Sequence, residues 1–237
     1  MPDDAGPSPG SSPLISTPLR DIKAVLFDLD GTLFDRETAV REVVTGQYAA
    51  FSSELAGATR ERFVGRVLEL DAHGYGDKSE IYPRLVRELG LPEPLAARLH
   101  AHFWDTYATV APALPGARAT LAALRARGHR LGVVTNGRVR VQEAKLRALD
   151  LLPYLDVVLI SEREQLRKPD PAIFLRAVER LGLRAGQACY VGDHPVNDAL
   201  GARDAGLHAV WLRTPHFPAP ELAHTAIDGL SELLALI

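Results

Sequence analysis

An apolar run that ends in acidic residues lies near the start of the chain. Residues 21–28 are mainly apolar and β-prone, and Asp30 and Gly31 follow shortly after them. A short apolar run bounded by a turn signal is typical of a buried strand, and strands of this kind belong to parallel sheets. We therefore predict a strand over residues 21–28 and a loop over residues 30–35.

The next 75 residues or so show helical periodicity. Apolar side chains recur at helical spacing in segments that begin near Val40, Phe63, Ile81 and Leu95. The segment contains no convincing strand pattern. An all-helical block directly after the first strand predicts a separate helical cap domain over residues 36–111.

From residue 112 onwards, strand and helix patterns alternate. Strands are predicted over residues 130–135, 156–161, 188–192 and 208–212. Helices are predicted over residues 115–128, 138–149, 171–181, 195–205 and 230–236. Such alternation is typical of βαβ units, which build a mostly parallel sheet with helices on both faces. We predict an α/β fold with a doubly wound, Rossmann-like core made of residues 21–35 and 112–237, into which the helical cap is inserted.

Composition and charge exclude several classes of protein. Residues 1–20 are rich in proline, serine, glycine and aspartate, so we interpret them as a disordered leader outside the fold. The net charge of −3 provides no basic surface for nucleic acid, and we expect no nucleic-acid partner. No stretch approaches the ~20 apolar residues needed to cross a bilayer, so no membrane association is expected.

The cysteine content predicts the compartment. Cys189 is the single cysteine and lies within an apolar run that reads as a buried strand. A disulfide within one chain is therefore impossible, which agrees with a reducing, cytoplasmic location. The sequence leaves open whether the protein is a monomer or a homodimer.

The two carboxylates after the first strand carry the first chemical signal. Because side chains alternate along an extended chain, Asp28 and Asp30 face the same side. Two like charges so close require a cation, a difference in protonation or a nearby positive group. The pair therefore indicates a magnesium site or an acid/base pair, and the alternative is a solvated strand end.

Polar residues also follow the other predicted strands. Thr135 and Asn136 end the second strand, Lys168 precedes a proline and an aspartate, and residues 192–198 read Gly-Asp-His-Pro-Val-Asn-Asp. Each could merely cap a helix or lie on the surface. Because the carboxyl ends of parallel strands share one edge of a sheet, these loops are expected to meet.

The order, spacing and context of these four motifs resemble those of the haloacid dehalogenase-like hydrolase superfamily. The resemblance covers residues 21–236 and is specific for the superfamily but not for a substrate. The helical insert resembles the cap placed after the first strand in the phosphatase branch, as in phosphoglycolate phosphatases and nucleotidases. The resemblance implies that Asp28 attacks phosphorus and that Asp30 protonates the leaving alcohol and then activates water. It also implies Mg²⁺ as cofactor, bound by Asp28, by the backbone carbonyl of Asp30 and by Asp193.

The same resemblance implies roles around the phosphate. Thr135 and the amide of Asn136 would hold phosphoryl oxygens, and Lys168 would neutralise charge on Asp28 and the phosphate. Gly31 would allow the tight turn that brings backbone amides toward the phosphate.

Four further residues complete the predicted site. By resemblance, Asp198 would orient Lys168 or a metal-bound water, and Asn197 would share that task. In the cap, Tyr75 and Lys78 lie in a polar, glycine-containing loop that could hang over the site and select the leaving group. The competing interpretation of this loop is a solvated helix connection.

Asp30 discriminates between branches of the superfamily. Its dehalogenases attack carbon without a metal and lack an acid at this position, so an acid here favours a phosphatase. The expected substrate is a small soluble phosphomonoester: a sugar phosphate, a phosphoglycolate-like compound or a nucleoside monophosphate. A phosphomutase and a non-catalytic module that binds a phosphate ligand remain the alternatives.

Overall fold

The computed structural model describes residues 19–107, 109–220, 223 and 225–237. The predicted leader, residues 1–20, falls outside these ranges except for Leu19 and Arg20. The backbone N–H of Leu19 donates to the carbonyl of Leu236 at 2.8 Å, so the chain enters the fold beside its C-terminal helix.

In the described residues, six parallel strands form one sheet in the order β3-β2-β1-β4-β5-β6. The strands are β1 (Ala24–Phe27), β2 (Arg130–Thr135), β3 (Val157–Ile160), β4 (Ala188–Gly192), β5 (His208–Leu212) and β6 (Thr225–Ile227). The five predicted strands are present, and the predicted α/β fold with its doubly wound sheet is confirmed. The prediction missed β6, because a strand of three residues carries too little periodicity to be recognised.

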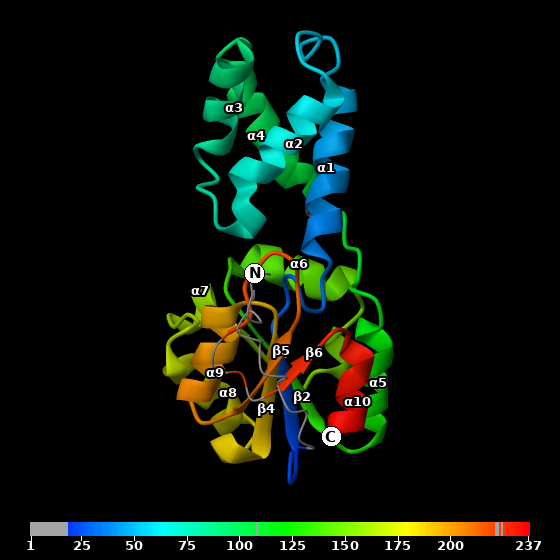
Figure 1. Cartoon of the computed structure of the whole chain (residues 1–237), viewed down its shortest axis with the longest axis vertical. Coiled ribbons are helices and arrows are strands. Elements are labelled where there is room, and N and C mark those ends of the chain that lie inside the picture. The colour runs from blue at the N-terminus through cyan, green and yellow to red at the C-terminus, as the bar shows by residue number, and fades with distance from the viewer. Residues whose placement is uncertain (1–18, 108, 221–222, 224) are drawn as a thin grey trace, which may run out of the picture.

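Helices cover both faces of this sheet (Figure 1). One face is covered by α8 and α9, and the other by α5 and α10. The core helices are α5 (Ala117–Ala126), α6 (Val139–Ala148), α7 (Ser161–Glu164), α8 (Pro171–Arg180), α9 (Gly201–Asp204) and α10 (Leu233–Leu236). A π-helical turn, Pro195–Leu200, leads into α9 and makes up half of the helix predicted there.

The remaining helices follow β1 and are grouped at one end of the molecule (Figure 1). They are α1 (Arg36–Ala50), α2 (Arg60–Asp71), α3 (Ile81–Leu89) and α4 (Leu95–Tyr107). No helix in the described ranges combines the length and the apolar character that a membrane span requires. The division into core and cap at residues 35 and 112 stays a prediction.

The central strand β1 is buried on both faces. Val25 and Phe27 join the apolar cluster that includes helices α5 and α10, whereas Ala24 and Leu26 join the cluster that includes α8 and α9. All four side chains are fully buried. This explains why the strand reads as a continuous apolar run in the sequence.

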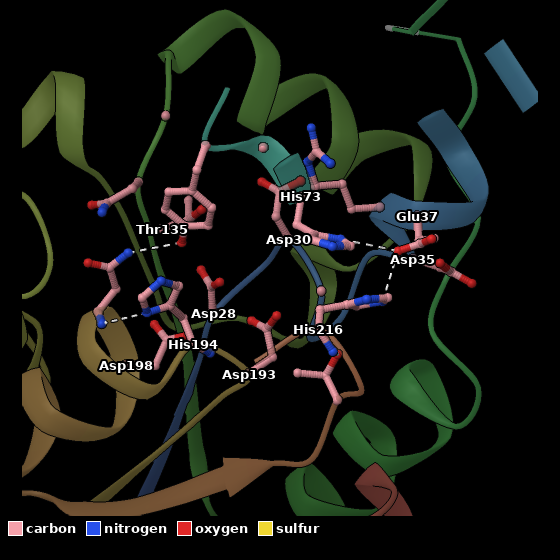
Figure 2. Close-up of a pocket in the computed structure, with 18 of the residues that line it drawn as sticks. Asp28, Asp30, Asp35, Glu37, His73, Thr135, Asp193, His194, Asp198 and His216 are labelled. Atoms are coloured by element: carbon pink, nitrogen blue, oxygen red, sulfur yellow. Dashed lines mark hydrogen bonds and ion pairs between the residues drawn. The ribbon is translucent and has the colours of Figure 1, made fainter. Parts of the chain in front are cut away.

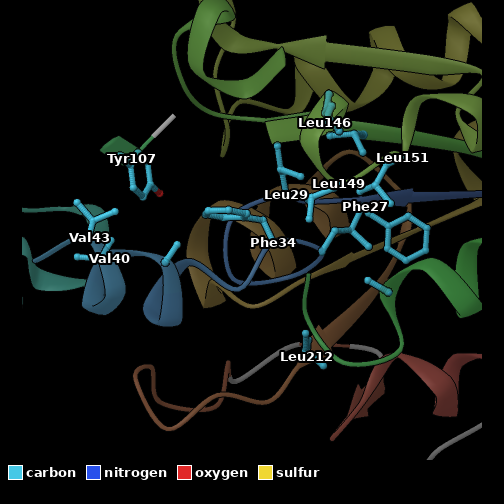
Figure 3. Packing of buried hydrophobic residues seen from close by; sticks show 14 of the residues in the cluster. Phe27, Leu29, Phe34, Val40, Val43, Tyr107, Leu146, Leu149, Leu151 and Leu212 are labelled. Atoms are coloured by element: carbon cyan, nitrogen blue, oxygen red, sulfur yellow. The ribbon is translucent and has the colours of Figure 1, made fainter. Parts of the chain in front are cut away.

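Phe34 connects the sheet to the helical block (Figure 3). It follows the β1 loop, is fully buried, and meets Tyr107 of α4 edge-to-face at a ring separation of 6.1 Å. Val40 and Val43 of α1 belong to the same apolar cluster as Phe27. The packing that fixes β1 therefore continues into the helices above it, and the loop after β1 is held between them.

Candidate active site

A large cavity lies where the strand order of the sheet reverses. The chain runs from β1 outward to β2 and β3, then returns to the other side of β1 at β4, so Asp28 and Asp193 follow neighbouring strands. Ligands bind at such switch points in open α/β sheets. The cavity measures about 1000 Å³ and is lined by the loops after β1, β2, β4 and β5 together with α1, α4 and α6 of the helices.

Lys168 is a buried cation at the floor of this cavity. Its Nζ lies 2.6 Å from Asp28 Oδ1 and 2.7 Å from Asp198 Oδ1, and donates to the Tyr190 hydroxyl at 2.7 Å. Burial alone would lower the pKa of Lys168, but the charges of Asp198 and Asp28 raise it above its ordinary value. The side chain is therefore charged at neutral pH, which is the state needed to offset charge on Asp28 and a phosphate.

The negative charge of Asp28 and Asp193 is only partly balanced by neighbouring cations of the protein. Carboxylate oxygens of Asp28, Asp193 and Asp198 lie within 4.8 Å of one another, and all three residues are buried. Burial raises the pKa of Asp28 to about 7 and that of Asp193 to about 8, and repulsion from Asp198 adds to both shifts. A divalent cation relieves this repulsion, and oxygen ligands are the donors that Mg²⁺ prefers.

Asp198 is occupied by protein donors. Its Oδ1 accepts from Lys168, and its Oδ2 accepts from the backbone N–H of His194 at 3.0 Å. The hydroxyl of Tyr190 adds a longer contact of 3.3 Å to Oδ1. Both carboxylate oxygens of Asp198 are thus taken by protein donors, one of them Lys168, and its role in orienting Lys168 for catalysis stays a prediction.

Gly31 permits the close approach of Asp193 to the β1 loop. Its φ of 82° lies in the left-handed region, where a side chain is strained. A Cβ at this position would lie 2.5 Å from Asp193 Oδ2. The indole Nε1 of Trp211 holds the same aspartate from behind by donating to its backbone carbonyl at 2.7 Å.

Asp30 points away from the other carboxylates toward helix α6. Lys145 Nζ lies 2.5 Å from Asp30 Oδ1, and Gln142 Nε2 donates to Asp30 Oδ2 and to Thr135 Oγ1, both at 2.7 Å. Burial opposes ionisation of Asp30, but the charge of Lys145 and these hydrogen bonds hold its pKa below the ordinary value. The side chain is therefore available as a base, while its backbone stays beside Asp28.

The sequence interpretation missed Lys145 and Gln142. The available signals were weak: lysine is scarce in this chain, and the two residues are three apart on the predicted helix, so they share a face. Both side chains are buried and line the cavity. They join Asp30 to Thr135 at the end of β2.

Asn136 joins two of the predicted motifs. Its Nδ2 donates to the carbonyl of Lys168 and its Oδ1 accepts from the backbone N–H of Lys168, both at 2.9 Å. The side chain thus fixes the position of Lys168 relative to Thr135, whereas the prediction concerned only the Asn136 amide.

The predicted residues from the helical block reach the cavity in different ways. Tyr75 is 59% exposed, lies against the His194 ring at 4.9 Å, and its hydroxyl accepts from Asn197 Nδ2 at 3.0 Å. Asn197 therefore contacts Tyr75, and none of its described hydrogen bonds is to Lys168. Lys78 also lines the cavity, but its ammonium is paired with Asp71 Oδ1 at 2.5 Å.

Comparison with known families shows to which family the chain belongs. Residues 22–206 match the family described as haloacid dehalogenase-like hydrolase. The chain belongs to this family. The superfamily predicted from the four motifs is thus confirmed, and so is the prediction that the protein is an enzyme of the hydrolase class.

Relatives of this hydrolase include phosphatases of the same superfamily. It is 35% identical over 207 residues to a glyceraldehyde 3-phosphate phosphatase of Methanopyrus kandleri, covering 81% of this chain and 84% of the relative. It is 37% identical over 229 residues to a phosphoglycolate phosphatase of Rhodospirillum rubrum, covering 90% and 89%. The crystal structure of a phosphatase from Thermococcus onnurineus superposes with a TM-score of 0.63 at 30% identity, covering 91% of this chain and 97% of that structure. These relatives support the predicted phosphatase branch.

Proposed function

We propose that this hydrolase is a Mg²⁺-dependent phosphatase that cleaves a small soluble phosphomonoester through an aspartyl-phosphate on Asp28. One observation carries the proposal: Asp28 lies beside both the Lys168 ammonium and the Asp193 carboxylate, at the point where the strand order reverses and two residues before Asp30. In this proposal a nucleophile, a positive charge, a cation ligand and an acid–base group surround one position.

The residues fit a hydrated Mg²⁺. Asp28 and Asp193, with the backbone carbonyl of Asp30, would hold the ion, and the raised pKa values of the two carboxylates reflect a charge that a cation balances. Bound there, Mg²⁺ would supply positive charge to the phosphoryl oxygens, and its remaining ligands would come from water and substrate.

The chemistry then falls to side chains of this chain. An oxygen of Asp28 forms a bond to phosphorus as the bond to the alcohol oxygen breaks, and Asp30, protonated at this stage, gives its proton to that oxygen. In the second step water attacks the same phosphorus, gives its proton to Asp30, and the bond to Asp28 breaks. The backbone around Thr135 and Asn136 orients the phosphoryl oxygens, while Lys168 offsets their charge and that of Asp28.

The size of the cavity and the cations in its wall suit a small phosphorylated substrate. Besides the three lysines already described, Arg36, Arg138, Arg167 and Arg213 line it, together with acidic residues. Glyceraldehyde 3-phosphate and phosphoglycolate, named for the relatives, are compact phosphates of this kind, and sugar phosphates and nucleoside monophosphates are of a size that about 1000 Å³ holds. A cytoplasmic location, and a monomeric or homodimeric state, belong to the same proposal.

A phosphate-release screen tests the proposal. Purified protein with Mg²⁺ is assayed against phosphoglycolate, glyceraldehyde 3-phosphate, other sugar phosphates, nucleoside monophosphates and an aryl phosphate. We expect release from at least one compound, loss of activity in Asp28→Asn, and retention in Asp105→Asn, which changes an exposed carboxylate on α4.

Two other results would contradict the proposal. Interconversion of sugar phosphate isomers without net phosphate release would indicate a phosphomutase. Absence of turnover together with Mg²⁺-dependent binding of a beryllofluoride phosphate mimic would indicate a module that binds phosphate without catalysis.

A further inference from the structure

A second cluster of potential metal ligands lies at the rim of the cavity. Its members are Glu37 in the first turn of α1, His73 in the short turn Ala72–Gly74, and His216 in the loop after β5. All three line the cavity that also contains Asp28. We call these three residues the rim cluster. None of them has a part in the proposed phosphatase chemistry.

Both imidazoles point at one oxygen (Figure 2). His216 Nε2 lies 2.8 Å from Glu37 Oε2, and His73 Nδ1 lies 3.4 Å from the same atom. The two rings are stacked with centroids 4.1 Å apart and an interplanar angle of 28°. Three separate segments of the chain therefore present one nitrogen or oxygen donor each to a common point.

These separations match the edges of a metal coordination sphere. Imidazole nitrogen and carboxylate oxygen bind Zn²⁺ at about 2.0–2.2 Å, so two such donors on one ion lie about 2.9–3.4 Å apart at bond angles between about 90° and 110°. The two measured contacts to Glu37 are 2.8 and 3.4 Å, and all three donor atoms lie within 4.8 Å of one another. An ion could bind with small side-chain shifts.

The donor set favours a different ion from that proposed at Asp28. Two imidazoles and one carboxylate suit Zn²⁺ and neighbouring transition metals, whereas Mg²⁺ prefers an all-oxygen shell. The side chains of His73, Glu37 and His216 are 44%, 37% and 31% exposed. Water therefore has access to the remaining coordination positions, on the side of the cavity.

The backbone and the surrounding rings hold the histidines in place. His73 has a φ of 54° in the left-handed region, a conformation uncommon for a residue other than glycine. Its ring also meets that of Phe217 at 6.2 Å, and Phe217 in turn lies 4.7 Å from the ring of His194. Because Phe217 is next to His216, the turn from the helical block is positioned against this loop of the core by apolar contacts, independently of any hydrogen bond.

We infer that Glu37, His73 and His216 form a binding site for a divalent transition metal of the Zn²⁺ class. A bound ion ties helix α1 and the turn after α2 to the loop after β5, across the mouth of the cavity. This inference concerns residues outside the proposed catalytic set, and it holds whether or not the phosphatase proposal does.

Metal titration of the full chain tests the site. Tag-free protein in excess Mg²⁺ is titrated with Co²⁺, followed by visible absorption, and the bound Co²⁺ is then displaced by Zn²⁺. We expect one equivalent of Co²⁺ to bind with the absorption of a nitrogen- and oxygen-bound ion. Replacing a ligand by His73→Ala or His216→Ala should weaken binding by about tenfold or more.

Two control variants separate the rim cluster from other sites. His102→Ala removes a histidine of α4 outside the cluster, and Asp193→Asn removes a ligand of the proposed Mg²⁺ site; both should bind Co²⁺ as the wild type does. The inference is overturned if the wild type binds neither Co²⁺ nor Zn²⁺, or if the two rim substitutions leave affinity unchanged. It is equally overturned if Asp193→Asn alone abolishes binding, since the ion would then occupy the Asp28–Asp193 site.

Discussion

Lys145 Nζ lies 2.5 Å from Asp30 Oδ1, so the residue proposed as acid and base forms an ion pair with a buried cation of α6. The ammonium also lies over the rings of Phe34 and Tyr107, at 4.7 and 5.1 Å from their centroids. The pairing lowers the pKa of Asp30 and holds its carboxylate toward α6. Lys145 is therefore expected to control both the orientation and the pKa of Asp30.

The variant Lys145→Met tests this control, because it keeps an unbranched side chain only one atom shorter and removes the charge. Since the charge of Lys145 lowers the pKa of Asp30, its loss should raise that pKa and move the acid limb of the kcat–pH profile to higher pH. At neutral pH kcat should fall by about tenfold or more, as positioned acid–base groups contribute about 10²–10⁴-fold. Lys23→Met, at an exposed position before β1, is the control. An unchanged pH profile in Lys145→Met would contradict the assigned role.

Lys168 balances two buried carboxylates, so its removal should affect folding as well as catalysis. Lys168→Met leaves Asp28 and Asp198 without their cation, and breaking a buried pair in this way costs about 3–5 kcal/mol. We expect a loss of this size in the free energy of unfolding measured with urea, and no detectable phosphatase activity.

A double substitution separates the charge effect from lost packing. In Lys168→Met/Asp198→Asn one of the stranded charges is also removed, so the loss of stability should be smaller than the sum of the two single losses. Additive losses would show that the ion pair contributes little to stability.

The sequence located the chemistry at the strand ends because strand position and side-chain alternation are local properties. Asp28, Thr135 and Asp193 each follow a recognisable apolar run, and a parallel sheet brings such ends to one edge. The doubly wound sheet could be predicted for the same reason, and the superfamily from the resemblance of the four motifs. The predicted bounds of β2, β4 and β5 match the observed ones, because polar residues or glycines flank these strands in the sequence.

What the sequence did not reveal depends on how separate elements pack. The contact of Lys145 with Asp30 requires one face of α6 to lie over the β1 loop, and the pairing of Asn197 with Tyr75 requires the helical block to approach the core. The rim cluster joins residues that are far apart in the sequence, Glu37 and His216. No local pattern encodes such contacts, because they follow from tertiary packing.

We expect phosphatase activity to require Mg²⁺, and Mg²⁺ binding to raise the thermal stability of the protein. The pKa of Asp193 rises to about 8 because of burial and repulsion from Asp198 and Asp28, so Mg²⁺ binding relieves an unfavourable charge arrangement. Chelation with EDTA should abolish phosphate release, and added Mg²⁺ should restore it. Because a ligand that binds only the folded state stabilises it, Mg²⁺ should raise the Tm of the wild type but not that of Asp193→Asn. An equal rise in both would place the ion elsewhere.

Gly31 and Gly90 offer a matched pair for testing the approach of Asp193. Both have positive φ, 82° and 65°, but a Cβ at Gly90 would meet nothing within 4 Å, whereas one at Gly31 would lie 2.5 Å from Asp193 Oδ2. Gly90→Ala should therefore lower the free energy of unfolding by only about 1 kcal/mol, the cost of a positive φ for a residue with a side chain. Gly31→Ala should cost more and should also weaken Mg²⁺ binding, measured by calorimetric titration. Equal effects on stability and unchanged Mg²⁺ affinity would contradict the close contact.

Asp71 should make the stability of the helical block depend on pH. Its carboxylate binds Arg36 through two hydrogen bonds, of 2.7 and 2.9 Å, and also pairs with Lys78. Burial alone would raise the pKa of Asp71, but Arg36 and Lys78 together lower it below the model-compound value of 3.8. A carboxylate whose pKa is lowered by folding stabilises the fold above its unfolded pKa, and this contribution is lost as the pH falls through the folded pKa.

Asp71→Asn should therefore be less stable than the wild type at pH 7, by about 1–3 kcal/mol, the range for a buried hydrogen bond that loses a charged partner. Urea unfolding at pH 7 and near pH 3 measures the difference, which should shrink at the lower pH as the wild-type carboxylate becomes protonated. Glu69→Gln is the control, because Glu69 is 67% exposed and its pairing with Arg66 contributes little. If the difference between Asp71→Asn and the wild type is the same at both pH values, the ionised form of Asp71 does not stabilise the fold.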